Sequence, residues 1–111
     1  MSFVYVPQTP AKYDHGSKLW VPTVNLSPAR KFGKIVELLP AGANRVGIAP
    51  MVQALKEQMA NYGEDDYLVA LGDPSLIAAA ACIAVRQTGG LLRLLKWDRL
   101  ASDYVATELR I

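Results

Sequence analysis

The side chains that could do chemistry in this chain are few and scattered. There is one histidine, His15, and one cysteine, Cys82. A metal site needs several His, Cys or carboxylate ligands that converge, and a Cys–His nucleophile pair needs both side chains within hydrogen-bond reach. His15 lies near the N-terminus, and Cys82 lies in the most apolar stretch, which predicts a core position. We therefore predict no metal site, no cofactor and no Cys–His pair.

A second candidate is the sequence Gly72-Asp73-Pro74, which leads from an apolar run into an apolar helix. A helix N-terminus can bind phosphate through its free N–H groups and the positive end of its dipole. Asp73, however, is a favourable N-cap whose carboxylate would accept those donors itself, and Pro74 has no N–H to give. The turn also lacks the repeated glycines of a dinucleotide-binding fingerprint. We interpret the turn as a helix start, with a phosphate cradle as the alternative.

Alternating strands and helices must position these residues. Continuous apolar runs predict strands, and apolar residues at helical spacing predict helices. Strands that alternate with helices pair in parallel through right-handed crossovers, and the short connection between the last two strands predicts an antiparallel hairpin. We predict an α/β fold, a small Rossmann-like βαβαββ domain with three parallel strands and an antiparallel edge strand. The strands are predicted at 34–39, 67–71, 91–97 and 104–111, and the helices from Pro50 to Tyr62 and over 74–87.

Three shorter segments complete this prediction. The sequence "LSPARKFG" predicts one helical turn, with Ser27 as N-cap and Gly33 at its end. The acidic run at 64–66 is interpreted as a solvated turn rather than as a pair of catalytic carboxylates. The helix over 74–87 is apolar on all sides, which predicts that most of its surface is buried.

The predicted sheet brings several polar side chains to one edge. In an open parallel sheet, ligands bind at the carboxyl ends of the strands, and the loops after three predicted strands meet there. For Asp98 and Arg99 we favour the interpretation that they brace their own hairpin, with ligand binding as the alternative. The candidate ligand-binding residues at this edge are Asn44, Arg45, Asp73, Ser75, Asp98 and Arg99.

The N-terminal region differs in character from the rest. It holds three of the seven prolines, which confine strands to sheet edges or to an extended arm. We predict an extended Pro-rich arm over 1–26 and a single α/β domain over 27–111. Aromatic and basic side chains in and beside the arm suit a protein interface or single-stranded nucleic acid; otherwise the arm wraps its own sheet edge. The candidate interaction residues are Tyr5, Lys12, Tyr13, Lys18, Trp20, Arg30 and Lys31.

Composition limits the function classes. Hydrophobic residues make up 51% and charged residues 20% of the 111, which is a globular balance. The net charge of +2 gives no strong field for nucleic acid or membrane. The N-terminus lacks the pattern of a signal peptide, and the apolar run from Leu76 to Val85 is too short to span a bilayer. A single cysteine fits a reducing compartment, so we expect a cytoplasmic protein.

Three stretches of the sequence resemble a set of small tailed-bacteriophage proteins. They are "LSPARKFGKIVELLP", "DDYLVALGDPSLIAAAACIAVRQTGG" and "LLRLLKWDR" followed by "YVATELRI". The shared features are a Ser-Pro-Ala turn, a strand ending in Leu-Leu-Pro, a Gly-Asp-Pro strand–helix junction and a Leu-Lys-Trp-Asp-Arg hairpin. The resemblance covers most of 26–111. It implies a phage origin, action in the bacterial cytoplasm, and a role in host takeover or replication support, and it brings no catalytic residues.

These observations lead to three hypotheses of function. The first is a non-enzymatic phage accessory protein that binds another protein of the host or of the phage replication or transcription machinery. The second is a binder of a nucleotide or other small ligand, and potentially an enzyme, at the carboxyl edge of the sheet. The third is single-stranded nucleic-acid binding through the basic aromatic arm. A symmetric homodimer is a further expectation, because the strand at 34–39 is a predicted edge and the arm could add a strand to a neighbour.

Overall fold

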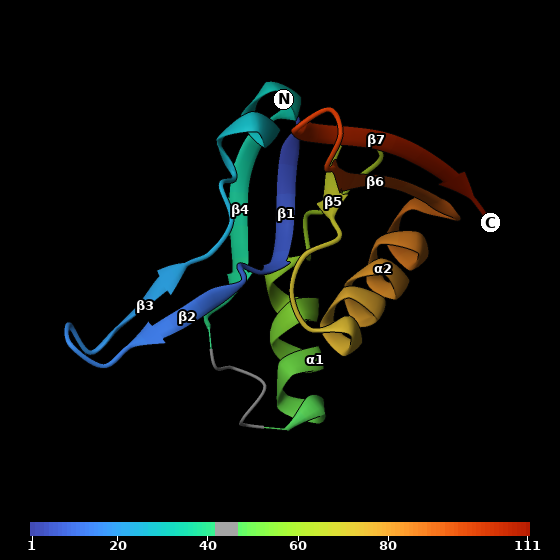
Figure 1. The fold of residues 1–111 in the computed structure, drawn as a ribbon. Coiled ribbons are helices and arrows are strands. Elements are labelled where there is room, and N and C mark those ends of the chain that lie inside the picture. The colour runs from blue at the N-terminus through green and yellow to red at the C-terminus, as the bar shows by residue number, and fades with distance from the viewer. Residues whose placement is uncertain (42–46) are drawn as a thin grey trace.

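The computed structural model describes residues 1–41 and 47–111, arranged as a sheet with helices packed on it (Figure 1). The main sheet has five strands in the order β4-β1-β5-β6-β7, and all neighbours are parallel except the last pair. The predicted α/β fold is confirmed. The elements are β1 (Phe3–Gln8), β2 (Ala11–Asp14), β3 (Leu19–Pro22), η1 (Ser27–Phe32), β4 (Lys34–Leu39), α1 (Ile48–Gln58), β5 (Tyr67–Val69), α2 (Pro74–Thr88), β6 (Leu91–Asp98) and β7 (Asp103–Arg110).

Strand β1 corrects the prediction of an extended arm over 1–26. It lies inside the sheet between β4 and β5, and Val4 and Val6 are fully buried. The Lys34 N–H donates to the Ser2 carbonyl, so the backbone N–H and C=O groups of the even-numbered residues of β1 point toward β4. The backbone groups of the odd-numbered residues, Pro7 among them, point toward β5. The pairing of β1 with β5 ends at Tyr5 and Leu68. The N–H that Pro7 lacks therefore falls beyond the end of that ladder, and a proline is tolerated within the sheet.

Both α-helices cover the same face of the sheet (Figure 1). The crossovers β4–α1–β5 and β5–α2–β6 proceed in the same direction along the sheet, so right-handed connections place both helices on one side. The buried stripe of α1 includes Met51 and Leu55, as its spacing predicts. The opposite face is covered by η1 and its flanks, which pack Ala29, Leu26 and Phe32 against Val4, Val6 and Leu95. A doubly wound Rossmann sheet has helices on both faces, and this sheet differs from it in that respect.

Helix α2 is less buried than its composition predicts. Leu76, Ala80, Ile83 and Ala84 face the core, whereas Ala78 and Cys82 are exposed. Helix α2 has one layer of neighbours, α1 beside it and the sheet beneath it, so its far side remains uncovered. The prediction that Cys82 lies in the core is wrong.

The chain forms two antiparallel hairpins, one separate from the main sheet and one at its edge. Strands β2 and β3 form a separate two-stranded sheet that projects away from the main sheet and helices (Figure 1). Strands β6 and β7 form the predicted antiparallel hairpin at the edge of the main sheet. The predicted turn at 27–33 is a 3-10 helix over Ser27–Phe32. Its N-cap position is Leu26 and not Ser27, because the first helical hydrogen bond runs from the Ala29 N–H to the Leu26 carbonyl at 2.9 Å.

Candidate functional site

The Gly-Asp-Pro junction at the carboxyl edge starts helix α2. The carboxylate of Asp73 accepts a hydrogen bond from the backbone N–H of Ser75 at 2.8 Å, and Pro74 is the first helical residue. The capping interpretation is confirmed. Ser75 itself is exposed on the first turn. An incoming anion would meet the fixed charge of Asp73 in place of free N–H groups.

Gln8 ties this junction to the end of strand β1. Its buried side chain accepts a hydrogen bond from the Asp73 N–H at 3.4 Å and donates one to the Pro40 carbonyl at 3.2 Å. Gly72 approaches closely, since a Cβ placed on it would lie 2.9 Å from the Gln8 carbonyl oxygen. Gln8 could not be identified from the sequence, because nothing in a lone glutamine at the end of an apolar run marks it as a bridge between three strand ends.

Two other predicted residues of this edge, Asp98 and Arg99, lie at the β6–β7 turn. Asp98 accepts hydrogen bonds from the N–H groups of Leu100 at 2.9 Å and Ala101 at 3.3 Å, so its carboxylate stabilises the β6–β7 turn. Arg99 is exposed in that turn. Asn44 and Arg45 lie outside the described residues. The carboxylates of Asp73 and Asp98 therefore each stabilise their own turn.

A shallow groove of about 310 Å³ lies beside this edge. Trp97 packs edge-on against Tyr104, with ring centroids 5.1 Å apart, and the Tyr104 hydroxyl donates to the Asn25 carbonyl at 3.3 Å. Burial raises the pKa of Tyr104, so its hydroxyl stays neutral. The lining is uncharged and comprises Thr23, Val24, Asn25, Leu71, Trp97 and Tyr104.

The β2–β3 hairpin carries the exposed aromatic and basic side chains. Leu19 is 63% exposed and Trp20 is 40% exposed, and Tyr13 and Val21 are also exposed. Tyr13 packs edge-on against Trp20 with centroids 5.4 Å apart, so the two rings form one surface. The two core clusters of the protein contain no residue from 11–22. We call these residues, 11–22, the hairpin surface.

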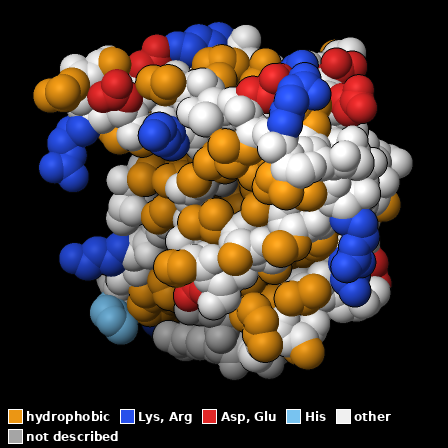
Figure 2. Space-filling model, turned by 90° about the vertical axis from the view of Figure 1, so that its right-hand side faces the viewer, with side chains coloured by type: hydrophobic (Ala, Val, Ile, Leu, Met, Phe, Trp, Pro, Cys, Tyr) orange, Lys and Arg blue, Asp and Glu red, His pale blue; other side chains and the backbone are white. Residues whose placement is uncertain are grey.

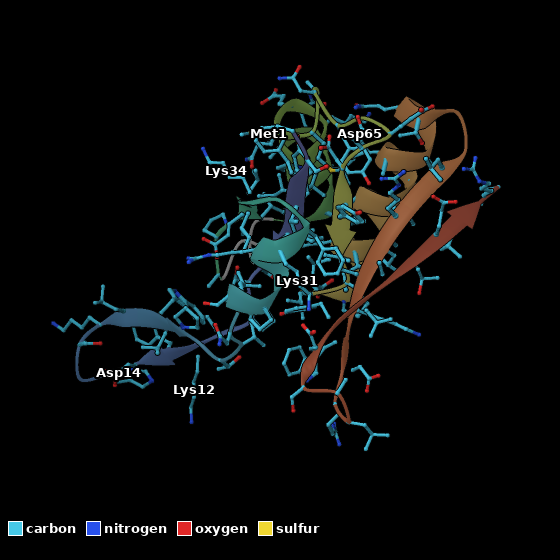
Figure 3. All side chains as sticks on the ribbon, turned by 90° about the horizontal axis from the view of Figure 1, so that it is seen from above. Met1, Lys12, Asp14, Lys31, Lys34 and Asp65 are labelled. Carbon is cyan, nitrogen blue, oxygen red and sulfur yellow. The ribbon has the colours of Figure 1, made fainter. Side chains whose placement is uncertain are left out.

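The turn of this hairpin is held by Asp14. Its carboxylate accepts hydrogen bonds from the Ser17 hydroxyl at 2.7 Å and from the N–H groups of Gly16 and Ser17. These bonds, that from the Ser17 side chain first, lower the pKa of Asp14. Figure 3 shows Lys12 and Asp14 on the hairpin where it projects from the rest of the molecule. Lys12 and Lys18 are exposed there, so the surface combines rings with positive charge.

A second shallow groove, of about 370 Å³, separates the hairpin from the carboxyl end of β4. Trp20 and Pro22 line it on one side, and Leu38 and Pro40 line it on the other. Thr9, where the chain passes from β1 to the hairpin, donates a hydrogen bond to Glu37 at 2.6 Å across the same gap. Trp20 thus lines a groove whose walls are mostly apolar, with Thr9 and Glu37 as its polar side chains.

Three predicted interaction residues lie away from the hairpin. Tyr5 is buried beneath the helices, 5% exposed, and cannot contribute to a surface of this chain; burial, together with the nearby Asp66, raises its pKa. Lys31 pairs with Asp103 and lies over the Phe32 ring, so it joins η1 to β7. Its hydrogen bond lowers the pKa of Asp103. Arg30 is exposed on η1.

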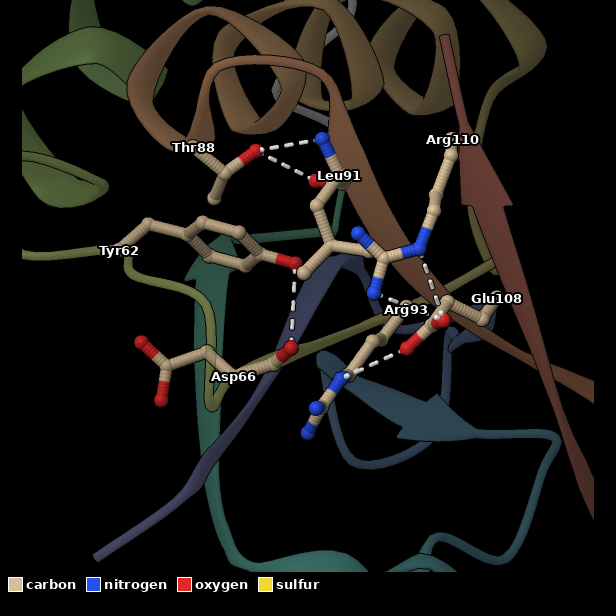
Figure 4. Close-up of polar contacts among 7 residues, drawn as sticks. All are labelled: Tyr62, Asp66, Thr88, Leu91, Arg93, Glu108 and Arg110. Carbon is tan, nitrogen blue, oxygen red and sulfur yellow. Dashed lines mark hydrogen bonds and ion pairs between the residues drawn. The ribbon is translucent and has the colours of Figure 1, made fainter.

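The predicted acidic turn at 64–66 contains a buried structural residue. Asp66 accepts hydrogen bonds from the N–H groups of Phe3 and Gly63, each at 2.9 Å, and the prediction that it is solvated is wrong. Its backbone carbonyl accepts the Tyr62 hydroxyl at 3.3 Å (Figure 4). Burial, and then the negative charge of Asp66, raises the pKa of Tyr62. This network joins the start of β1 to the approach to β5 and is structural.

Together these features define a small α/β protein with a projecting aromatic hairpin and, among the described residues, no group of three or more His, Cys, Asp or Glu that could hold a metal ion. A comparison with protein families matches residues 2–111 to the phage Pam3 gp32-like proteins. The chain belongs to this family, which confirms the resemblance to a phage protein and extends it over the N-terminal residues. No curated protein and no solved structure matches the chain. Within 1–41 and 47–111, no helix is both long and apolar enough to cross a membrane.

Proposed function

We propose that this phage-family protein acts by binding another protein through the hairpin surface, in the bacterial cytoplasm and without enzymatic activity of its own. The observation that carries the proposal is that Tyr13, Leu19, Trp20 and Val21 remain in water while their hairpin adds nothing to either core. Trp and Tyr are the side chains most enriched at the energetic centres of protein interfaces.

The geometry of the hairpin supports this proposal in a second way. A two-stranded hairpin without a packed face is only marginally stable in water, yet this one is specified by an Asp14-capped turn and an edge-on ring pair. The groove beside Trp20 would accept an apolar side chain of the partner. Lys12 and Lys18 favour a partner whose contact surface carries carboxylates around that side chain.

The test is affinity capture from host lysate with the tagged full chain, with and without nuclease. It compares the wild type, the double variant Tyr13→Ser/Trp20→Ser, and the control Leu100→Ser, which removes a side chain 98% exposed in the β6–β7 turn. We expect one stoichiometric protein that survives nuclease, is lost with the double variant and is kept by the control. Capture that is equal for all three chains would contradict the proposal. Capture that vanishes with nuclease would favour nucleic acid instead.

A second candidate function rests on the uncharged groove between Leu71 and Trp97. Its place at the carboxyl ends of β5 and β6 is where open parallel sheets bind small ligands. An aromatic ring could enter there, next to Trp97 and Tyr104. If this candidate is correct, one member of a panel of nucleotides and aromatic metabolites raises the melting temperature, and Trp97→Ala abolishes the rise. The absence of any rise would remove its support.

A further inference from the structure

Strand β7 forms a long and unprotected edge of the main sheet. It pairs with β6 over all eight residues, from Leu91 with Arg110 to Asp98 with Asp103, without a bulge. Natural proteins blunt such edges with prolines, bulges or very short strands, because the unpaired backbone groups recruit another strand. β7 has no proline and no bulge and is eight residues long, and the charge of Glu108 is paired with Arg93 and Arg110. The edge strand at the other side, β4, is shorter and is followed by Pro40.

The backbone of β7 shows which groups are available. The Ile111 N–H donates to the Gly90 carbonyl, toward β6, at 2.7 Å. Because N–H and C=O groups alternate in direction along a strand, the backbone groups of the odd-numbered residues of β7 point toward β6. The outward hydrogen-bonding groups belong to the even-numbered residues Tyr104, Ala106, Glu108 and Arg110. Among them, the Tyr104 N–H already donates to the Asp103 carboxylate at 2.8 Å.

The side chains beside this edge are apolar. Val105 and Leu109, on the helix side of the sheet, are each 39% exposed. On the same side of the sheet, helix α2 leaves Ala78 and Cys82 exposed. Figure 2 views the molecule from the side where α2 and the C-terminus lie in Figure 1, and hydrophobic side chains gather across the middle of that face with charged ones around it.

We propose that this edge binds a second copy of the chain, with β7 antiparallel to β7 of the partner about a twofold axis at Thr107. Opposed residues in an antiparallel pair share a face and the same hydrogen-bonding phase, so the two residue numbers of each pair must sum to an even number. With Thr107 opposite its own copy, Val105 opposes Leu109, Tyr104 opposes Arg110 and Ala106 opposes Glu108. On the helix side the two Val105–Leu109 pairs then flank the central Thr107 pair, and Glu108 and Arg110 each face a neutral side chain.

Neighbouring registers are less favourable. Moving the axis by one residue toward the C-terminus places Glu108 opposite Glu108, and like charges directly opposed are destabilising. Moving it by one residue the other way places Leu109 opposite Asp103 and Val105 opposite Thr107, so the apolar pair on the helix side is lost. The Thr107 register pairs residues 104–110 of β7 and makes one continuous sheet of two five-stranded halves. It satisfies the outward groups of Ala106 and Glu108, the Tyr104 carbonyl and the Arg110 N–H.

This inference does not depend on the proposed function. The hairpin surface follows β1 and borders β4, which is the edge strand opposite to β7. A dimer formed through β7 would therefore leave both copies of the hairpin surface exposed and would present a partner with two of them. Bivalent binding of that kind raises avidity without new contacts.

The first test is the molar mass of the full chain in solution, by sedimentation equilibrium at low to high micromolar concentration. We expect a dimer for the wild type and for Ala106→Thr, which keeps the outward N–H and suits a strand. Ala106→Pro removes that N–H but no bond to β6, and should weaken the dimer at least about tenfold. A monomer at every concentration, or a dimer that Ala106→Pro leaves unchanged, would overturn the proposal.

A second pair of variants decides the question even if Ala106→Pro does not fold. Thr107→Lys and Thr107→Glu each place two like charges opposite one another on the axis, so each variant alone should be monomeric. An equimolar mixture should form a one-to-one heterodimer. Homodimers of the single variants, or a mixture that stays monomeric while the wild type dimerises, would show that the axis is elsewhere.

Discussion

The Gly72→Ala substitution tests whether the carboxyl edge is held by close packing of two backbones. Gly72 has a φ of +113°, where side chains other than glycine are rare, and such strain costs about 1–3 kcal/mol. The new Cβ would lie 2.8 Å from the Gln8 Cβ and 2.9 Å from its carbonyl oxygen, so the backbone of β1 or of the junction must move. That movement would disturb the two hydrogen bonds of the Gln8 side chain, each worth about 1 kcal/mol.

We therefore expect Gly72→Ala to lower the free energy of unfolding by about 3–5 kcal/mol. The assay is equilibrium unfolding in urea, followed by circular dichroism. Gly63→Ala is the matched control, because nothing lies within 4 Å of a Cβ at that position, and its effect should stay within about 1 kcal/mol. If Gly72→Ala is as stable as the control, the close approach to Gln8 does not constrain this edge and the reasoning fails.

Three further predictions concern a buried tyrosine and two groups of structural hydrogen bonds. Burial raises the pKa of Tyr62 above its ordinary value of 10.0, so at higher pH the folded state retains a proton that the unfolded state loses. The free energy of unfolding should therefore fall as the pH rises above that value, and the fall should be smaller in Tyr62→Phe. Asp66→Ala leaves the Phe3 and Gly63 N–H groups without acceptors and should cost about 2–4 kcal/mol in thermal or urea unfolding, whereas no loss would mean that water replaces the carboxylate. Thr88→Val removes the hydroxyl that accepts the Leu91 N–H at 3.0 Å (Figure 4) and should cost about 1–3 kcal/mol, and a neutral result would show that the α2–β6 connection is held by packing alone.

The regular elements of the fold could be predicted because their patterns are local. The apolar runs that predict β4, β5 and β6 need no distant information, and the spacing of Met51 and Leu55 assigns the buried side of α1. The Asp73 cap follows from residue types alone, since an Asp before a Pro at a helix start has one favourable arrangement. These predictions are confirmed.

The place of β1 could not be predicted, because it depends on pairing between distant segments. Pro7 indicates an edge or an arm when the strand is considered alone, and only the early end of β5 makes a proline acceptable there. The exposure of α2 depends on how many layers pack around it, which composition does not state. The burial of Asp66 depends on the Phe3 N–H, which is 63 residues away in the sequence.

The most direct test of the account asks which tryptophan a bound partner covers. The chain has two, Trp20 on the hairpin surface and Trp97 in the groove at the carboxyl edge. Trp97→Phe and Trp20→Phe each leave one, whose fluorescence can be quenched by acrylamide with and without the captured partner. We predict that the partner shields Trp20 and leaves Trp97 as accessible as in the free protein. Shielding of Trp97 with Trp20 unchanged would contradict binding through the hairpin and would place the functional site at the carboxyl edge.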